Sequence, residues 1–146
     1  RNAFMMDTML RDVTIYGTAA KASATLKRQD LAGKTGTTNE YVDAWFCGYQ
    51  MTVAGCAWVG FDQPRKLGDK ETGGVAALPI WIGYMSRALK DVPIQTPSAP
   101  EGLVSSGEGR ERSYIYAENV KPKAEGEVEE DNTPLPKPDL SSPPSD

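Results

Sequence analysis

The amino-acid sequence predicts a mixed α/β (α+β) fold of one helix, three antiparallel strands and a second helix, followed by a disordered tail. Apolar side chains recur at helical spacing over residues 2–16 and again over residues 77–91. Residues 30–62 are rich in aromatic and β-branched side chains with interspersed glycines, which is typical of strands. Beyond Val92 these patterns are lost, and nine of the eleven prolines lie there. We therefore predict a folded part over residues 1–92 and a tail over residues 93–146.

The charge of the chain follows the same division. The formal charge of -4 is made up of +2 over residues 1–92 and -6 over residues 93–146. A segment rich in Pro, Ser, Gly and Glu buries too little apolar area to offset its ordering entropy. Disorder is therefore expected from Pro93 onward. Residues 113–116 (S-Y-I-Y) are the exception, and their docking or brief pairing is the alternative.

Composition also limits the classes of ligand and partner. The chain has no histidine and two cysteines, so neither a metal site nor another cofactor is expected. Basic clusters interleaved with aromatic residues are absent from the sequence, which argues against a nucleic-acid partner. No apolar run is long enough to span a membrane, and no signal peptide is recognisable.

Residues 2–16 are expected to form an amphipathic helix whose apolar face packs in the core. The apolar residues on this face, at three- and four-residue spacing, are Met6, Met9, Leu10 and Val13. Asn2 is suited to cap the N-terminus, and Gly17 is suited to end the helix.

Residues 77–91 are expected to form the second helix, with Pro79 in its first turn. Its apolar stripe consists of Leu78, Trp81, Ile82, Met85, Ala88 and Leu89. We expect this stripe to pack on a three-stranded sheet formed by residues 30–38, 43–50 and 52–62, with Trp45 or Trp58 beneath it. The last two strands form a hairpin that turns near Met51, although the usual Asn-Gly or Asp-Gly turn signal is absent.

Residues 31–38 (L-A-G-K-T-G-T-T) are the candidate binding stretch, because they combine one cation, three hydroxyls and two glycines. Lys34 supplies a compact positive charge, and Thr35, Thr37 and Thr38 supply hydroxyl groups on a backbone that favours a strand. The pattern indicates a strand that faces an anionic, peptide-like ligand. A nucleotide-binding P-loop is excluded, because the P-loop motif requires its first glycine five residues before Gly33, and that position holds Arg28.

Lys34 and the two residues after it match the K-T-G box of penicillin-binding proteins and serine β-lactamases. Other motifs follow in order at residues 17–19 (G-T-A), 43–46 (D-A-W-F), 58–62 (W-V-G-F-D), 71–74 (E-T-G-G) and 76–81 (A-A-L-P-I-W). Over residues 2–89 the chain resembles the end of the transpeptidase domain of class A penicillin-binding proteins, of the Gram-negative type. The resemblance implies the transpeptidase fold shared with serine β-lactamases, of which this chain would be the C-terminal piece.

The resemblance implies a D,D-transpeptidase of a bifunctional peptidoglycan synthase, which cross-links peptidoglycan by acyl transfer through a serine ester. The family draws its catalytic groups from S-x-x-K, S-x-N and K-T-G boxes. The first two are absent from residues 1–146, and residues 18–21 (T-A-A-K) mimic the first with threonine inside the G-T-A stretch. The nucleophilic serine is therefore expected upstream, and the chain alone is expected to be inactive.

By the same resemblance, Lys34 stabilises the negative charge of the ligand, and the hydroxyls of Thr35 and Thr37 hold its carboxylate. The backbone N–H of Thr37 matches one oxyanion donor, and Gly36 and Thr38 complete the substrate-binding strand. We interpret Asn39 and Asp43, which flank the cleft, as a turn former and a strand start.

The resemblance also implies partners and a location. The expected partners are peptidoglycan stem peptides, the lipid-linked precursor and β-lactams. A membrane anchor is expected upstream, at the periplasmic face of the bacterial inner membrane. Two alternatives remain: a serine β-lactamase, which shares the K-T-G box, and a non-catalytic module that recognises penicillin.

A turn centred between Met51 and Thr52 would place Cys47 opposite Cys56 on neighbouring strands. The family works outside the cytoplasm, where disulfides persist. Cysteine is also a common small buried hydrophobe, and a disulfide demands strict geometry. We therefore favour two free thiols, with a disulfide as the alternative.

Overall fold

The computed structural model describes residues 1–120, so the rest of the predicted tail, residues 121–146, lies outside the described residues. The helices are α1 (Asn2–Ile15), α2 (Ala20–Leu26) and α3 (Leu78–Ala88). The strands are β1 (Ala32–Thr37), β2 (Ala44–Gln50), β3 (Val53–Val59), β4 (Leu103–Ser106) and β5 (Ser113–Tyr116). The predicted helix, three strands and helix are present in that order, with the additional helix α2 between the first helix and the first strand.

The three-stranded sheet is antiparallel, with the order β1-β2-β3, and β2 and β3 form the predicted hairpin. Gln50 pairs with Val53, so only Met51 and Thr52 form the turn. The Gln50 Oε1 atom accepts hydrogen bonds from the backbone N–H and the hydroxyl of Thr52, both at 2.9 Å. This side chain supplies the turn contacts in a hairpin that lacks the Asn-Gly signal.

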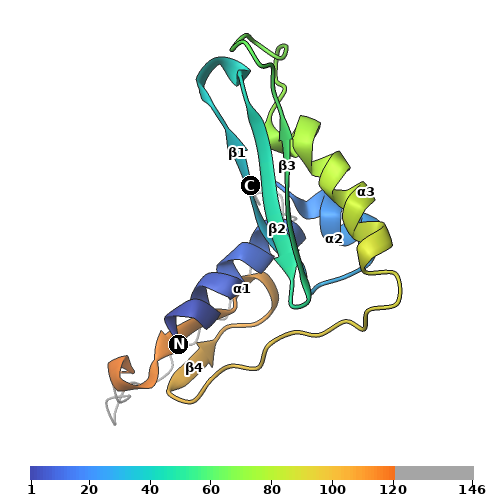
Figure 1. The fold of residues 1–146 in the computed structure, drawn as a ribbon. Coiled ribbons are helices and arrows are strands. Elements are labelled where there is room, and N and C mark those ends of the chain that lie inside the picture. Colours follow the sequence, from blue (N-terminus) through green and yellow to red (C-terminus); the bar gives the residue numbers. More distant parts are fainter. Residues whose placement is uncertain (121–146) are drawn as a thin grey trace, which may run out of the picture.

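Helix α3 covers one face of the sheet (Figure 1). Its buried stripe includes Trp81, whose ring meets that of Phe46 with 4.9 Å between centroids. Because side chains alternate along a strand, Phe46 on β2 points toward α3, whereas Trp45 points to the opposite face. Trp45 and Trp58 are 42% and 44% exposed there, so the prediction that either lies beneath the stripe is wrong.

Helix α1 lies against the opposite face, near the β2–β3 turn. The buried Thr14 hydroxyl donates to the Leu31 carbonyl over 2.6 Å, and the Tyr49 hydroxyl donates to Asp7 over 2.9 Å. Met6 and Met9 are 56% and 57% exposed, so the prediction that they pack in the core is wrong. The side of α1 that meets the sheet is held by hydrogen bonds of polar side chains, Asp7 and Thr14, and the spacing of apolar residues does not reveal such contacts. Asn2 is already helical, and Arg1 occupies the N-cap.

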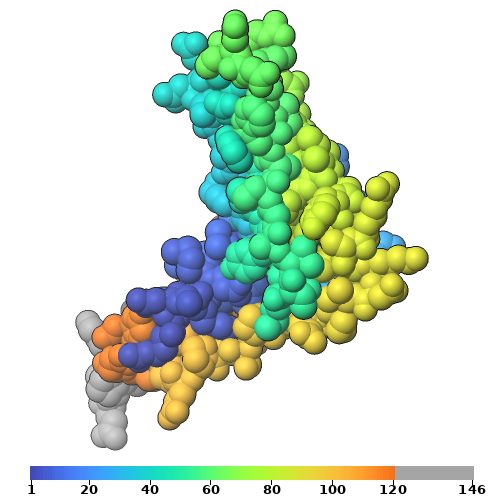
Figure 2. Space-filling view, viewed as in Figure 1, coloured from blue at the N-terminus to red at the C-terminus, as the bar shows by residue number. Residues whose placement is uncertain are grey.

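The described part of the tail contains strands β4 and β5, whereas its composition predicts disorder from Pro93. Strands β4 and β5 form a hairpin that packs on the N-terminal part of α1, as Figure 2 shows. The rings of Phe4 and Tyr114 meet edge to face at 5.0 Å. Arg1 forms a 2.8 Å ion pair with Glu118, and its guanidinium lies 4.7 Å from the centre of the Tyr116 ring.

A buried ion pair holds the start of the tail. Arg28 and Asp30 form a bidentate pair at 3.0 and 2.7 Å, and Arg28 also donates to the Val92 carbonyl over 2.7 Å. Asp30 further accepts from the Gln50 amide and the Gln95 backbone N–H, both at 3.0 Å. Burial raises the pKa of Asp30, but the hydrogen bonds from Arg28, Gln95 and Gln50 outweigh it and leave this pKa below its usual range.

Candidate functional site

Strand β1 carries the candidate stretch at the edge of the three-stranded sheet. Within residues 1–120 its outer edge pairs with no other strand. Ala32 and Gly33 at its start are buried, whereas Lys34 and Thr37 are exposed. An unpaired edge offers backbone N–H and C=O groups to an extended peptide. The strand therefore has the geometry of a peptide-binding edge.

Lys34 lies on the sheet face opposite α3, beside its cross-strand neighbour Cys47. Its ammonium donates to the carbonyl of Thr35 over 3.1 Å and to the hydroxyl of Thr35 over 3.3 Å. No carboxylate among residues 1–120 forms an ion pair with Lys34. The positive charge of Lys34 is therefore not neutralised by the described part of the chain.

The three threonine hydroxyls have different neighbours. Thr35 Oγ1 lies 3.2 Å from Thr18 Oγ1. Thr37 Oγ1 accepts a 3.0 Å hydrogen bond from the backbone N–H of Gly73, which leaves its own proton for another acceptor. Thr38 Oγ1 accepts from the backbone N–H of Asp43 over 2.8 Å and thereby closes the turn after β1.

The segment at residues 72–74 packs directly on β1 and β2. A Cβ atom at Gly73 would lie 2.1 Å from the Trp45 carbonyl oxygen and 2.6 Å from that of Gly36, so only glycine fits there. At Gly36 an added Cβ would meet Trp45 Cβ at 3.2 Å. The approach of one backbone to another, rather than of a ligand, therefore explains the glycine at position 73. The E-T-G-G sequence at residues 71–74 does not by itself indicate this contact with the strand.

Asn39 and Asp43 lie where the sequence predicts. Asn39 begins a short 3-10 turn, and Asp43 directly precedes β2. The Asp43 carboxylate accepts a 2.9 Å hydrogen bond from the Trp58 indole, and so it anchors one of the exposed tryptophans. Glu40 and Tyr41 in this turn have φ values of 60° and 57°, which side chains rarely adopt.

Cys47 and Cys56 form a disulfide, so the prediction of two free thiols is wrong. The two residues are direct cross-strand partners, and their Cα atoms are 4.1 Å apart. Both lie on the exposed face, in the same row as Lys34. The expectation that each thiol fills space in the core fails because the alternation of β2 turns Cys47 away from α3.

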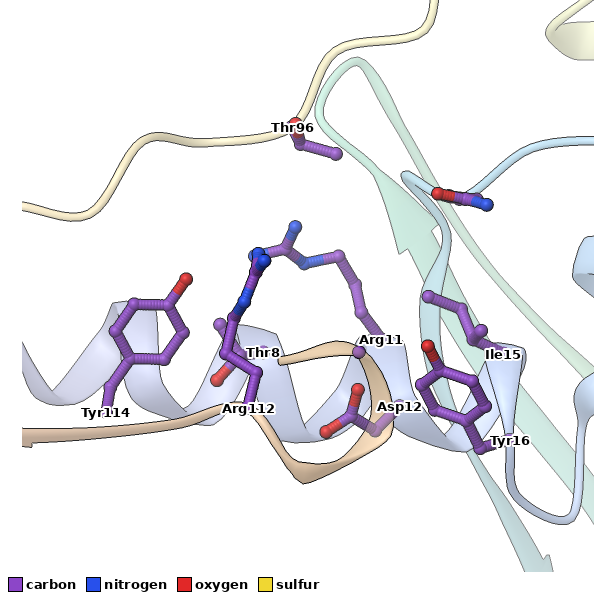
Figure 3. Close-up of a pocket in the computed structure, with 10 residues that line it drawn as sticks. Thr8, Arg11, Asp12, Ile15, Tyr16, Thr96, Arg112 and Tyr114 are labelled. Atoms are coloured by element: carbon purple, nitrogen blue, oxygen red, sulfur yellow. The ribbon is translucent and has the colours of Figure 1, made fainter. Parts of the chain in front are cut away.

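A separate cleft lies between α1 and the tail, on residues that do not belong to the candidate stretch (Figure 3). Arg11 from α1 and Arg112 from the tail extend into it, flanked by Tyr16 and Tyr114. Arg11 is already paired, because its Nε atom lies 2.9 Å from an Asp7 carboxylate oxygen. Sequence reasoning does not anticipate this cleft, since one wall belongs to a segment that composition predicts to be disordered.

The described residues contain neither a metal-binding cluster nor a membrane-spanning helix. Over residues 1–120, no group of three His, Cys, Asp or Glu side chains is placed to hold a metal ion. In the same part of the chain, every helix is too short or too polar to cross a membrane.

Comparison with known proteins identifies relatives. The chain is 56% identical over 105 residues to penicillin-binding protein 1A of Pseudomonas aeruginosa, covering 72% of this chain and 13% of that protein. It is 46% identical over 107 residues to penicillin-binding protein 1A of Neisseria flavescens, covering 73% of this chain and 13% of that protein. This chain belongs to the class A penicillin-binding proteins.

A solved structure agrees with this membership. The crystal structure of penicillin-binding protein 1A from Haemophilus influenzae has a TM-score of 0.70 to this chain at 33% identity, covering 79% of this chain and 20% of that one. No protein-family profile matches the chain. The chain spans about an eighth of the length of these curated relatives. The mixed helix-and-sheet fold predicted from the sequence is confirmed.

Proposed function

We propose that this chain supplies the K-T-G substrate-binding strand of a peptidoglycan cross-linking D,D-transpeptidase, within a bifunctional peptidoglycan synthase. The observation that carries the proposal is the arrangement of Lys34 on β1. Its unneutralised ammonium lies on an edge strand, within 3.3 Å of the Thr35 hydroxyl. A cation and hydroxyls along a free strand edge suit an extended peptide that ends in a carboxylate.

In this proposal, each group of the strand has a separate task. Lys34 attracts the carboxylate of the stem peptide or of a β-lactam, and the hydroxyls of Thr35 and Thr37 donate hydrogen bonds to it. The backbone N–H of Thr37 stabilises the oxyanion of the acyl-transfer transition state, where loss of one donor typically costs about a hundred- to a thousandfold in rate. Gly36 and Thr38 complete the binding strand.

The nucleophilic serine of this proposal lies in another part of the full-length protein. Residues 1–146 contain no S-x-x-K and no S-x-N sequence, so the chain lacks both serine boxes of the family. The second-box serine would face Lys34. The partners are then stem peptides, the lipid-linked precursor and β-lactams, and a membrane anchor lies upstream.

The proposed location is the periplasmic face of the bacterial inner membrane. The Cys47–Cys56 disulfide supports it, because disulfides persist in oxidising compartments such as the periplasm and are rare in the cytosol. Both sulfurs belong to exposed residues, so a cytosolic reductant would reach them.

Labelling with a fluorescent penicillin tests the function. A complete protein that carries this chain should form a stable covalent adduct, whereas residues 1–146 alone should form none, because the serine is absent. Penicillin turnover is measured in parallel. Rapid hydrolysis by the complete protein would indicate a β-lactamase, and absence of any adduct would indicate a non-catalytic module. Either result would contradict the proposal.

A further inference from the structure

We propose that Thr18 is a positioning residue for the K-T-G strand, because its hydroxyl sets the direction in which the Thr35 hydroxyl donates its proton. This inference rests on the proposed function, since it concerns how the same strand holds a carboxylate. Thr18 Oγ1 lies 3.2 Å from Thr35 Oγ1, although the residues are 17 positions apart in the chain. Thr18 is exposed, so a ligand on β1 can reach this pair of hydroxyls.

The backbone holds Thr18 firmly in place. Gly17 precedes it, and a Cβ atom at Gly17 would lie 2.9 Å from the Val13 Cα atom. Ala19 follows it, fully buried, and donates its N–H to the Val13 carbonyl over 3.0 Å. The Ala20 N–H donates to the Gly17 carbonyl over 3.1 Å. The turn between α1 and α2 therefore presents the Thr18 side chain to β1 at a fixed position.

The direction of the hydrogen bonds follows from the proton inventory. A hydroxyl has one proton and accepts at two positions, and an ammonium can only donate. Because Lys34 Nζ lies 3.3 Å from Thr35 Oγ1, the Thr35 oxygen accepts from Lys34. When Thr18 also donates to this oxygen, both acceptor positions of Thr35 are filled. The Thr35 proton is then directed to a third group, which is the carboxylate of the ligand.

The reverse arrangement is poorer for an anion. If Thr35 donated to Thr18, its proton would be occupied inside the protein and its lone pair would face the incoming carboxylate. The 72–74 segment limits other placements of the pair. A Cβ atom at Gly74 would lie 3.2 Å from the Thr18 carbonyl oxygen and 3.7 Å from Thr35 Cγ2, so the two threonines share one packing neighbour.

The test is the acylation of a complete protein that carries this chain, measured by stopped flow with a carboxylate-bearing penicillin. Thr18→Val should lower the second-order acylation rate about three- to tenfold, which corresponds to one neutral hydrogen bond. Thr18→Ser keeps the hydroxyl and should acylate within about twofold of the parent. Thr25→Val on the exposed side of α2 is the matched control and should acylate like the parent.

Two further measurements separate positioning from a general structural effect. Thr18→Val in a Thr35→Val background should cause no additional loss, because Thr18 acts through the Thr35 hydroxyl. The methyl ester of the same penicillin offers the Thr35 hydroxyl only a neutral, weaker acceptor, so Thr18→Val should lower the acylation rate less with the ester than with the acid. If Thr18→Val loses its near-UV circular dichroism, Thr18→Ala, which adds no atoms, takes its place.

The outcomes are distinct. Additive losses in the double variant, or an equal loss with the ester, would overturn the inference and leave Thr18 as a packing residue. A parental rate for Thr18→Val, in a protein that is slowed by Lys34→Ala, would also overturn it while the proposed function stands. A parent protein that penicillin does not acylate would overturn the proposed function itself.

Discussion

The backbone N–H of Gly73 donates a 3.0 Å hydrogen bond to the hydroxyl of Thr37, 36 positions earlier in the chain. This bond ties the segment before α3 to the end of the K-T-G strand. It forms only because Gly73 has no side chain, since the carbonyl oxygens of Gly36 and Trp45 occupy the space of a Cβ atom. The position of Thr37 therefore depends on a glycine outside the strand.

Gly73→Ala is expected to destabilise the chain by about 1–3 kcal/mol, because the added methyl group forces two backbones apart. Urea unfolding of residues 1–146, followed by near-UV circular dichroism, measures this change. Gly83→Ala is the matched control. Apart from the backbone of its own helix, no atom lies within 4 Å of a Cβ at Gly83, and alanine in a helix should stabilise by about 0.5–1 kcal/mol. Equal unfolding midpoints for the two variants would contradict the close packing at Gly73.

Lys34→Ala, in a complete protein that carries this chain, should slow penicillin acylation by at least about tenfold. Charge-assisted hydrogen bonds are stronger than neutral ones, and 1.36 kcal/mol is a factor of ten in rate. Lys34→Arg should restore only part of the rate, because a planar guanidinium does not replace a compact ammonium. Thr35→Val should do less harm than Lys34→Ala, since it removes a neutral donor and keeps the shape that favours a strand.

The measurement for this series is the second-order acylation rate of each folded variant. Lys90→Ala, an exposed cation near the end of α3, is the control for a general effect of charge and should acylate like the parent. If Lys34→Ala acylates at the parental rate, the K-T-G strand is not the carboxylate site.

Removal of the Cys47–Cys56 disulfide should destabilise the chain by about 2–3 kcal/mol, the loop-closure entropy of a short loop. The double variant Cys47→Ser with Cys56→Ser is compared with the oxidised parent by urea unfolding. Reductant should lower the unfolding midpoint of the parent and leave that of the double variant unchanged. Thiol titration of the denatured, unreduced parent should find no free thiol, and two thiols per chain would refute the bridge.

Asp30→Asn should destabilise the chain by about 3–5 kcal/mol at pH 7, because it leaves the buried Arg28 guanidinium without its counter-charge. The pKa of Asp30 is lower in the folded chain than its ordinary value of 3.8. Its contribution to stability is therefore fully present above about pH 4 and is lost as the pH falls through the folded pKa.

Urea unfolding between pH 5 and pH 2 checks the sign of this dependence. The parent should lose more stability than Asp30→Asn over this range, since the variant has no carboxylate to protonate at position 30. Asp62→Asn, at an exposed position, is the control and should keep the pH dependence of the parent. Parallel curves for the parent and Asp30→Asn would show that other groups control the acid unfolding.

The sequence by itself determined the features that depend on neighbouring residues. The spacing of apolar residues predicts the stripe of α3, because residues three and four apart share a helix face. Strands of aromatic residues that flank a short turn predict the hairpin. Lys34, Thr35 and Thr37 stand within four residues of one another, so the K-T-G pattern can be found without knowledge of the fold.

Only the tertiary structure decided which strand face is buried. The alternation of side chains along β2 places Phe46 on one face and Trp45 and Cys47 on the other. Both faces are apolar, so the sequence does not show which is buried; in the structure α3 packs on the face of Phe46. Because Phe46 faces α3, the two cysteines lie on the exposed face. The register of β2 and β3 makes them direct cross-strand partners, and they form a disulfide.

Contacts between residues far apart in the chain account for the rest. Tyr114 meets Phe4 across 110 positions, which stabilises a hairpin in a segment whose composition predicts disorder. Thr18, in the turn between α1 and α2, contacts Thr35, and Gly73, in the helical segment just before α3, contacts Thr37. Local sequence patterns show whether a segment favours a helix or a strand and which of its faces is apolar. They do not show which distant segment supplies the partner residue of a contact. Here the distant partners Thr18 and Gly73 position the threonine hydroxyls near Lys34.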